Sequence, residues 1–100
     1  MIKHIVFWKL KDEADEFSKT ENAKAIKQKL ESLNGKIAGL IKLEVGLDFL
    51  HSDESADVVL YSEFENKEAL VFYANHPLHK EIMPFIASAR SERRVVDYEV

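Results

Sequence analysis

Four histidines and one tyrosine are the side chains whose types and positions best fit acid–base or metal chemistry. The histidines are His4, His51, His76 and His79. The three-residue spacing of His76 and His79 can bring two imidazoles to one side of a helical turn, as a metal site requires. No HExxH motif accompanies them and no third ligand lies nearby, so a surface turn with incidental histidines is the alternative. We therefore expect no metal and no cofactor.

His79 has the properties of a general base. It follows Pro77 in the first turn of a predicted helix, where unpaired backbone N–H groups disfavour a positively charged imidazole. A neutral imidazole at cytosolic pH can accept a proton, which is what a general base must do.

His4 and Tyr73 each have a structural and a functional interpretation. His4 shares a strand face with Val6 and Trp8, where a histidine is commonly a hydrogen-bonded core residue. Tyr73 lies on a short amphipathic helix, where an aromatic ring commonly packs, but its hydroxyl can point toward the turn that carries His79. Both are candidates for one pocket with His79.

Two other polar groups are predicted to be solvated. His51 falls in the polar stretch 51–55, which reads as a loop. The basic cluster 90–94 has the composition to hold an anion, but Glu92 and Asp97 beside its arginines favour an exposed strand start with salt bridges.

Composition excludes several classes. The 100 residues include 14 basic and 18 acidic side chains, a net charge of −4 that argues against nucleic-acid binding. No apolar run reaches the ~18 residues of a membrane span, and the N-terminus lacks the layout of a secretory signal. Cysteine is absent, and there is no phosphate loop or GxSxG motif. We expect one cytoplasmic domain, residues 1–100.

Hydrophobic periodicity predicts alternating strands and helices. Apolar residues at every second position indicate strands at 1–10, 37–47, 57–64 and 93–100. Apolar residues three and four positions apart indicate helical structure over 12–34. Ser18 or Thr20 can cap that helix, and Asn66 can cap a second over 67–74. Another helical segment begins at Pro77, and we expect Pro84 to interrupt or restart it.

The order strand, helix, strand, strand, helix, strand predicts a ferredoxin-like α+β fold, a split βαβ with a four-stranded antiparallel sheet. The helices would cover one face. The other would expose an apolar set, too large to leave in water, of Ile5, Phe7, Val59, Tyr61, Val96 and Tyr98. Face-to-face stacking of two sheets would bury it, so we expect a homodimer.

Several segments together carry a resemblance to a known family. They are Lys3–Lys11, Val45–Asp48, Asp57–Phe64 with the following Glu68, Ala69, Leu70 and Tyr73, His76–His79, and Val95–Tyr98. In this order they resemble the stress-responsive A/B barrel (Dabb) domain over nearly the whole chain. The resemblance implies a dimeric α+β barrel, in which two ferredoxin-like sheets associate across their open faces.

The family is related to the plant olivetolic acid cyclase, which closes a polyketide chain by an aldol step. By similarity to that enzyme, His79 matches the catalytic base, Tyr73 the hydroxyl that orients the substrate, and His4 a pocket histidine. Val58 stands where that enzyme has a further histidine, and Trp8 replaces a smaller aliphatic residue. We expect a small apolar or aromatic ligand in a pocket that also includes Val6, Trp8, Val58, Leu60 and His76.

Three functions stay open on the sequence alone. An open cavity that touches His4, Tyr73 and His79 would favour ligand binding or acid–base catalysis. A cavity sealed by Trp8 would favour a structural, stress-protective dimer. A cofactor-free monooxygenase of the same fold is the third.

Overall fold

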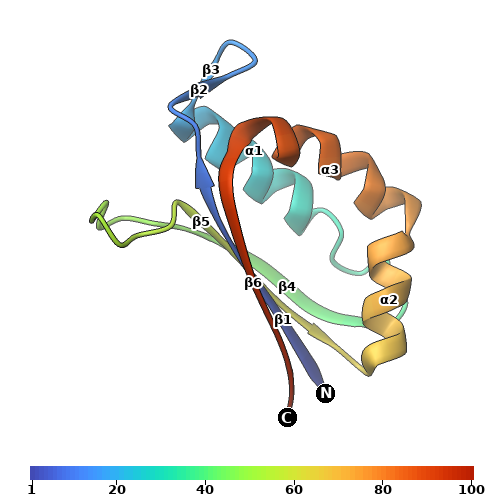
Figure 1. Ribbon diagram of the computed structural model, residues 1–100. Coiled ribbons are helices and arrows are strands. Elements are labelled where there is room, and N and C mark those ends of the chain that lie inside the picture. The colour runs from blue at the N-terminus through green and yellow to red at the C-terminus, as the bar shows by residue number, and fades with distance from the viewer.

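The protein consists mainly of a four-stranded antiparallel sheet that is covered by helices on one face (Figure 1). The computed structural model describes residues 1–100. The sheet has the strand order β4-β5-β1-β6, so β1 and β5 are central. Its strands are β1 (Ile2–Leu10), β4 (Leu40–Leu47), β5 (Val58–Phe64) and β6 (Arg90–Glu99). The helices are α1 (Lys19–Glu31), α2 (Lys67–Asn75) and α3 (Pro77–Ala89). The predicted ferredoxin-like α+β fold is confirmed.

Alternation along the strands separates two faces. Val6, Leu60 and Phe64 point to the helices and join Ile26 and Leu30 of α1 in a core of 18 buried hydrophobic residues. Phe7, Val96 and Tyr98 point to the opposite face, where 40–52% of each residue is exposed. The apolar face predicted from period two is therefore present and uncovered in the single chain.

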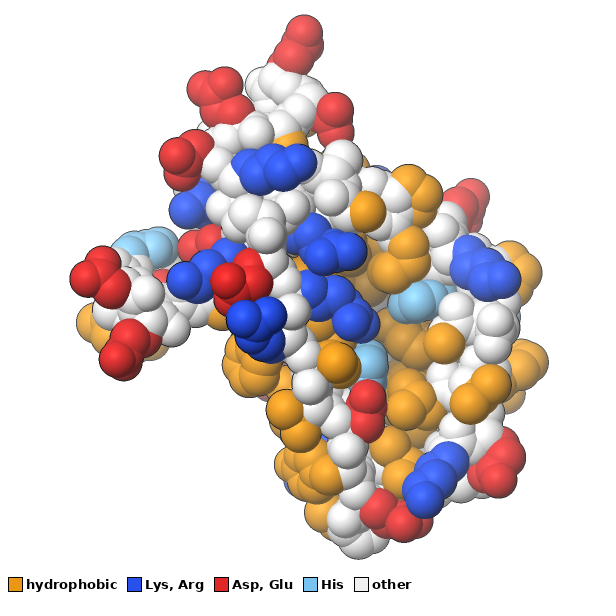
Figure 2. Space-filling model, in the orientation of Figure 1, with side chains coloured by type: hydrophobic (Ala, Val, Ile, Leu, Met, Phe, Trp, Pro, Cys, Tyr) orange, Lys and Arg blue, Asp and Glu red, His pale blue; other side chains and the backbone are white.

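The helices leave part of the sheet uncovered on their own side. A hollow opens beside β6, between the sheet and the segment that contains α2 and α3 (Figure 2). Hydrophobic and histidine side chains are visible inside it, and basic side chains stand at its rim.

The first helix is shorter than the predicted range 12–34. Residues 13–18 instead form a β-hairpin of β2 (Glu13–Ala14) and β3 (Phe17–Ser18), with Asp15 and Glu16 at φ 52° and 71°. Two consecutive residues in this left-handed region make a tight hairpin turn, which the acidic composition did not reveal. Ser18 then caps α1 in a capping box with Glu21, so the predicted cap is confirmed.

Two boundaries in the C-terminal half also differ from expectation. Pro84 lies inside α3 without interrupting it, because it is on the exposed side of the helix, where water can satisfy the carbonyl that loses its hydrogen bond. The last strand begins at Arg90, directly after α3, rather than at Arg93. Asn66 caps α2 as predicted, accepting a hydrogen bond from the backbone N–H of Ala69 at 2.8 Å.

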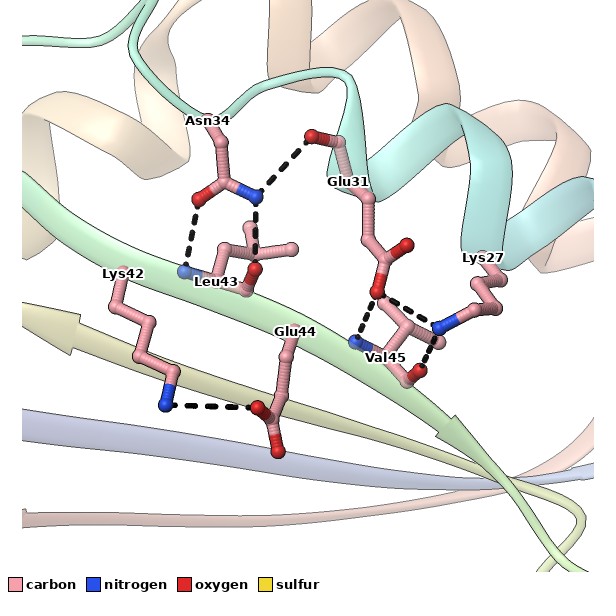
Figure 3. Close-up of polar contacts among 7 residues, drawn as sticks. All are labelled: Lys27, Glu31, Asn34, Lys42, Leu43, Glu44 and Val45. Carbon is pink, nitrogen blue, oxygen red and sulfur yellow. Dashed lines mark hydrogen bonds and ion pairs between the residues drawn. The ribbon is translucent and has the colours of Figure 1, made fainter.

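Side chains from α1 and the following turn occupy the outer edge of β4 (Figure 3). Asn34 accepts from the N–H of Leu43 at 3.0 Å and donates to its carbonyl at 2.8 Å. Glu31 accepts from the N–H of Val45 at 3.0 Å, and the Lys27 ammonium donates to the Val45 carbonyl at 2.6 Å. These bonds satisfy backbone groups that an edge strand otherwise offers to another chain.

Replacing Asn34 should therefore destabilise the protein. Asn34→Ala leaves the N–H and carbonyl of Leu43 without their partner, and we expect a loss of about 1–3 kcal/mol in the free energy of unfolding. Urea denaturation at fixed protein concentration measures it. Asn75→Ala is the matched control, because Asn75 donates only to the exposed carbonyl of Val71, and its effect should stay within about 0.5 kcal/mol. Equal losses in the two variants would contradict this account.

Candidate functional site

His79 presents one free ring nitrogen. It lies in the first turn of α3, and its Nδ1 is 3.2 Å from the carbonyl oxygen of Ala74 in α2. A carbonyl only accepts hydrogen bonds, so Nδ1 carries the proton and Nε2 of the neutral ring keeps its lone pair. The chain bends between α2 and α3 at His76 and Pro77, and this bend brings His79 close to Ala74.

The surroundings of His79 keep it neutral. Burial lowers the pKa of His79 below its usual 6.5, and the electrostatic influence of the nearby His4 and Arg93 acts in the same direction. The hydrogen bond to Ala74 opposes them, with a smaller effect than burial. At neutral pH the ring is therefore available to accept a proton at Nε2.

Tyr73 is packed beside His79 with its hydroxyl buried. Its ring centroid lies 4.4 Å from that of His79 and 5.0 Å from that of Phe64, and only 1% of the residue is exposed. The hydroxyl has no hydrogen-bond partner. Burial raises the pKa of Tyr73 well above its usual 10, so the group stays protonated and keeps its hydrogen to donate.

His4 is held by a carboxylate on the neighbouring strand. His4 and Asp97 face each other across β1 and β6, and His4 Nδ1 contacts Asp97 Oδ1 in a close charge-assisted pair. Its ring lies 6.4 Å from that of Tyr73, edge to face. The carboxylate occupies Nδ1 and orients the ring, which leaves the other nitrogen, Nε2, without a partner in the protein.

One cavity of about 450 Å³ brings these three residues together. Ten of its 15 lining residues are hydrophobic, which suits an apolar small molecule. Of the residues expected from the sequence, the cavity is lined by His4, Val6, Trp8, Leu60, Tyr73 and His79. Figure 2 shows the hollow open to the surface rather than sealed.

Val58 and His76 do not line this cavity. Val58 pairs with Trp8 across β1 and β5 and is 1% exposed, within the core. His76 caps α3, because its Nδ1 accepts from the N–H of Leu78 at 3.1 Å, and its ring meets Phe72 edge-on. His76 and His79 thus make separate contacts, and no group of three or more potential metal ligands gathers anywhere in the structure.

The cavity also contains polar residues that the sequence analysis did not assign to it. Asp97, Arg90 and Arg93 line it from β6, and Leu30, Met83 and Ile86 contribute from the helices. The three polar residues can be assigned to the cavity only when the pairing of β6 with β1 is known, because this pairing decides which side chains of β6 share a face with His4.

A family model for the stress responsive A/B barrel domain (Dabb) matches residues 2–100. The chain belongs to this family. A dimeric protein of unknown function with a ferredoxin-like fold from Bacteroides fragilis is 37% identical, with a TM-score of 0.86, over 99% of this chain and 95% of that one. A dimeric ferredoxin-like protein of unknown function from a Jannaschia species is 27% identical, with a TM-score of 0.78, over 99% and 98%.

The fold also occurs in an enzyme. The hydroxynitrile lyase of Passiflora edulis is 16% identical to this Dabb protein, with a TM-score of 0.80, over 99% of this chain and 92% of that one. At that identity the likeness shows the fold alone. No curated protein matches the sequence, and the relation to the plant polyketide cyclase stays a prediction. None of the three helices is long and apolar enough to cross a membrane.

The protonation of His79 is directly measurable. Its imidazole should titrate below pH 6.5 in the folded protein, and its nitrogen-15 shifts should show the proton on Nδ1. Arg93→Gln should raise the pKa, because it removes a positive charge that disfavours the imidazolium. The same histidine in urea-unfolded protein is the control and should titrate close to 6.5.

The lowered pKa of His79 also makes the stability of the folded protein depend on pH. Between the two pKa values the unfolded chain binds this proton and the folded protein does not. The contribution of His79 to stability is therefore complete above about pH 6.5 and is lost as the pH falls through its lowered folded-state pKa. A folded-state midpoint at or above 6.5 would contradict the geometry described here.

Proposed function

We propose that this Dabb protein is a homodimer that binds a small carbonyl compound and catalyses proton transfer at the carbon beside the carbonyl group. The observation that carries the proposal is the open cavity that holds a neutral imidazole, a buried free hydroxyl and a carboxylate-paired histidine.

Each of these groups fits one part of the reaction. His79 Nε2 takes the proton, and the electron pair of the broken carbon–hydrogen bond forms a carbon–carbon double bond. The π pair of the carbonyl group moves to its oxygen, which gives an enolate. The Tyr73 hydroxyl donates a hydrogen bond to that oxygen, where negative charge develops. His4, held by Asp97, stands beside them as a second group able to exchange a proton. Attack of the enolate on a second carbonyl of the same molecule would close a ring, the aldol step that the resemblance implies.

The open cavity favours this function over a purely structural dimer. Trp8 lines the cavity but leaves about 450 Å³ unfilled, within the range of small-molecule sites. A stable core gains nothing from the buried unpaired hydroxyl of Tyr73, which costs about 1–3 kcal/mol without a partner. A ligand oxygen would supply that partner.

The open face of the sheet supports the homodimer. Apolar side chains line its centre, and similar structures from B. fragilis and Jannaschia are described as dimeric. Charged residues, including Lys42 and Glu44, surround these apolar groups on the same face. An apolar centre with a charged rim is the composition of a stable interface.

Hydrogen exchange tests the catalysis. In deuterated water the protein should accelerate exchange beside the carbonyl of a neutral ketone such as 4-phenyl-2-butanone, measured by proton NMR. His79→Ala should slow the exchange by about 10²–10⁴-fold and Tyr73→Phe by about 10²–10³-fold. The rate should fall as the pH drops through the lowered pKa of His79, because the base must be neutral.

His51→Ala is the matched control, because His51 is exposed in the β4–β5 loop and does not line this cavity. It should leave the exchange rate unchanged. A wild-type protein that accelerates exchange of no ketone, or a folded His79→Ala variant as active as wild type, would refute the proposal.

Sedimentation tests the dimer. Wild type should sediment as a dimer at micromolar concentration, and Phe7→Asp combined with Val59→Asp should give a monomer or an insoluble chain, because both charges fall on the apolar open face. Phe72→Asp is the matched control, since Phe72 is 51% exposed on α2, on the other side of the sheet. A monomeric wild type, or an equal effect of Phe72→Asp, would contradict this assembly.

A further inference from the structure

Two arginines of β6 line the cavity without an acidic partner. Arg90 is half-buried, Arg93 is exposed, and neither guanidinium forms an ion pair or a side-chain hydrogen bond in the structure. Arg94, the next residue, lies on the opposite face of β6 and contacts Glu92 at 3.9 Å. The expected salt bridge is therefore present at Arg94 and absent at Arg90 and Arg93, although Arg93 is exposed as expected.

The cavity itself contains no free negative charge to balance them. Its one carboxylate, Asp97, is engaged by His4. Two unbalanced guanidinium groups beside an apolar cavity are an unusual feature in a chain with 18 acidic and 14 basic residues. Their positive potential is available to an anion that enters the cavity.

A buried hydrogen-bond donor lies close to Arg93. Trp8 pairs with Arg93 across β1 and β6, so the two side chains share the helix-facing side of the sheet as direct neighbours. Trp8 is 4% exposed and lines the cavity, and its Nε1 has no hydrogen-bond partner. Buried indole N–H groups usually have an acceptor, and this one has none within the protein.

We propose that Arg90, Arg93 and Trp8 form an anion subsite that binds the carboxylate of a substrate whose remaining body is apolar. The inference rests on the proposed function, since it names the substrate class for the same cavity: a carboxylic acid that also carries a carbonyl group. The guanidinium groups pair with the carboxylate at the mouth, and the indole N–H donates to one of its oxygens.

The dimensions and lining of the cavity favour a carboxylate with a short apolar body. A space of about 450 Å³ holds roughly 15 non-hydrogen atoms if each takes the ~30 Å³ of a water molecule. His4 and Trp8 are four residues apart on β1, which spans about 13 Å of strand. The acid–base groups and the anion subsite therefore lie toward two different parts of one cavity.

This arrangement gives the anion a positioning role. With the carboxylate fixed beside Arg93, the apolar body extends along Val6 and Leu60, and the carbonyl end approaches Tyr73 and His79. Binding at one end thus orients the carbon–hydrogen bond that breaks at the other.

Calorimetric titration with matched probes tests the subsite. The carboxylate 3-phenylpropanoate should bind roughly tenfold or more tightly than its neutral amide of the same shape, 3-phenylpropanamide. Inorganic phosphate, which has charge but no apolar body, should bind more weakly than the acid. Arg90→Gln and Arg93→Gln should each reduce the preference for the acid, and the double variant should bind acid and amide about equally.

The controls separate this site from general electrostatics and from unfolding. Arg94→Gln removes the same charge on the other face of the strand and should keep the preference. Arg93→Lys keeps the charge and should retain part of it, and Trp8→Phe should weaken acid binding severalfold relative to the amide. Thermal denaturation establishes that each variant is folded.

Several outcomes would overturn the subsite. They are equal binding of acid and amide by wild type, no binding of the acid at millimolar concentration, or an equal loss of preference in Arg94→Gln. His79→Ala distinguishes the two proposals, because it should abolish ketone exchange and keep the preference for the acid. If ketone exchange depends on His79 but the protein binds acid and amide equally, the catalytic proposal is supported and the anion subsite is refuted.

Discussion

The antiparallel pairing of β1 with β6 is the constraint on which the site depends. Its register sets His4 opposite Asp97, Val6 opposite Val95 and Trp8 opposite Arg93. Because side chains alternate between faces, a shift of one residue would turn Asp97 and Arg93 away from the helices and toward the open face. The first and last strands of the chain thus build one wall of the cavity together.

The opposite wall depends on the junction between α2 and α3. His76 ends one helix and caps the next, and Pro77 has no N–H to leave unpaired in the first turn. The resulting bend sets His79 against Tyr73 and against the carbonyl of Ala74. The Tyr73 ring fills the space between β1 and this junction, so packing and chemistry are shared by one side chain.

Much of this architecture is readable from the sequence because it follows from periodicity and local capping. Burial alternates along β5 and along parts of β1 and β4, whereas β6 is exposed along nearly its whole length. Ser18 and Asn66 are local capping signals with a defined partner three residues later. Tyr73, His79 and His4 reach one cavity, as the resemblance implies, although their catalytic roles remain a proposal.

The parts that sequence patterns missed depend on long-range pairing or on unusual backbone angles. The turn at Asp15 and Glu16 has no glycine to signal its positive φ. Arg93 lines the cavity and Arg94 lies on the opposite face, although the two residues are adjacent and chemically identical, because the register against β1 decides which face each one joins. The face on which Arg90 lies is harder still to predict from the sequence, because an irregularity between Lys9 and Leu10 shifts the register of the pairing just before it.

Trp8 has a consequence for how the molecule can be observed. It is the single tryptophan of the chain, and its buried indole lines the cavity with Nε1 unpartnered. Indole emission depends on the polarity and hydrogen bonding around the ring, so the fluorescence of the whole protein reports on the interior of this one space. The chain carries its own optical probe, and occupancy of the cavity can be followed without attaching a label.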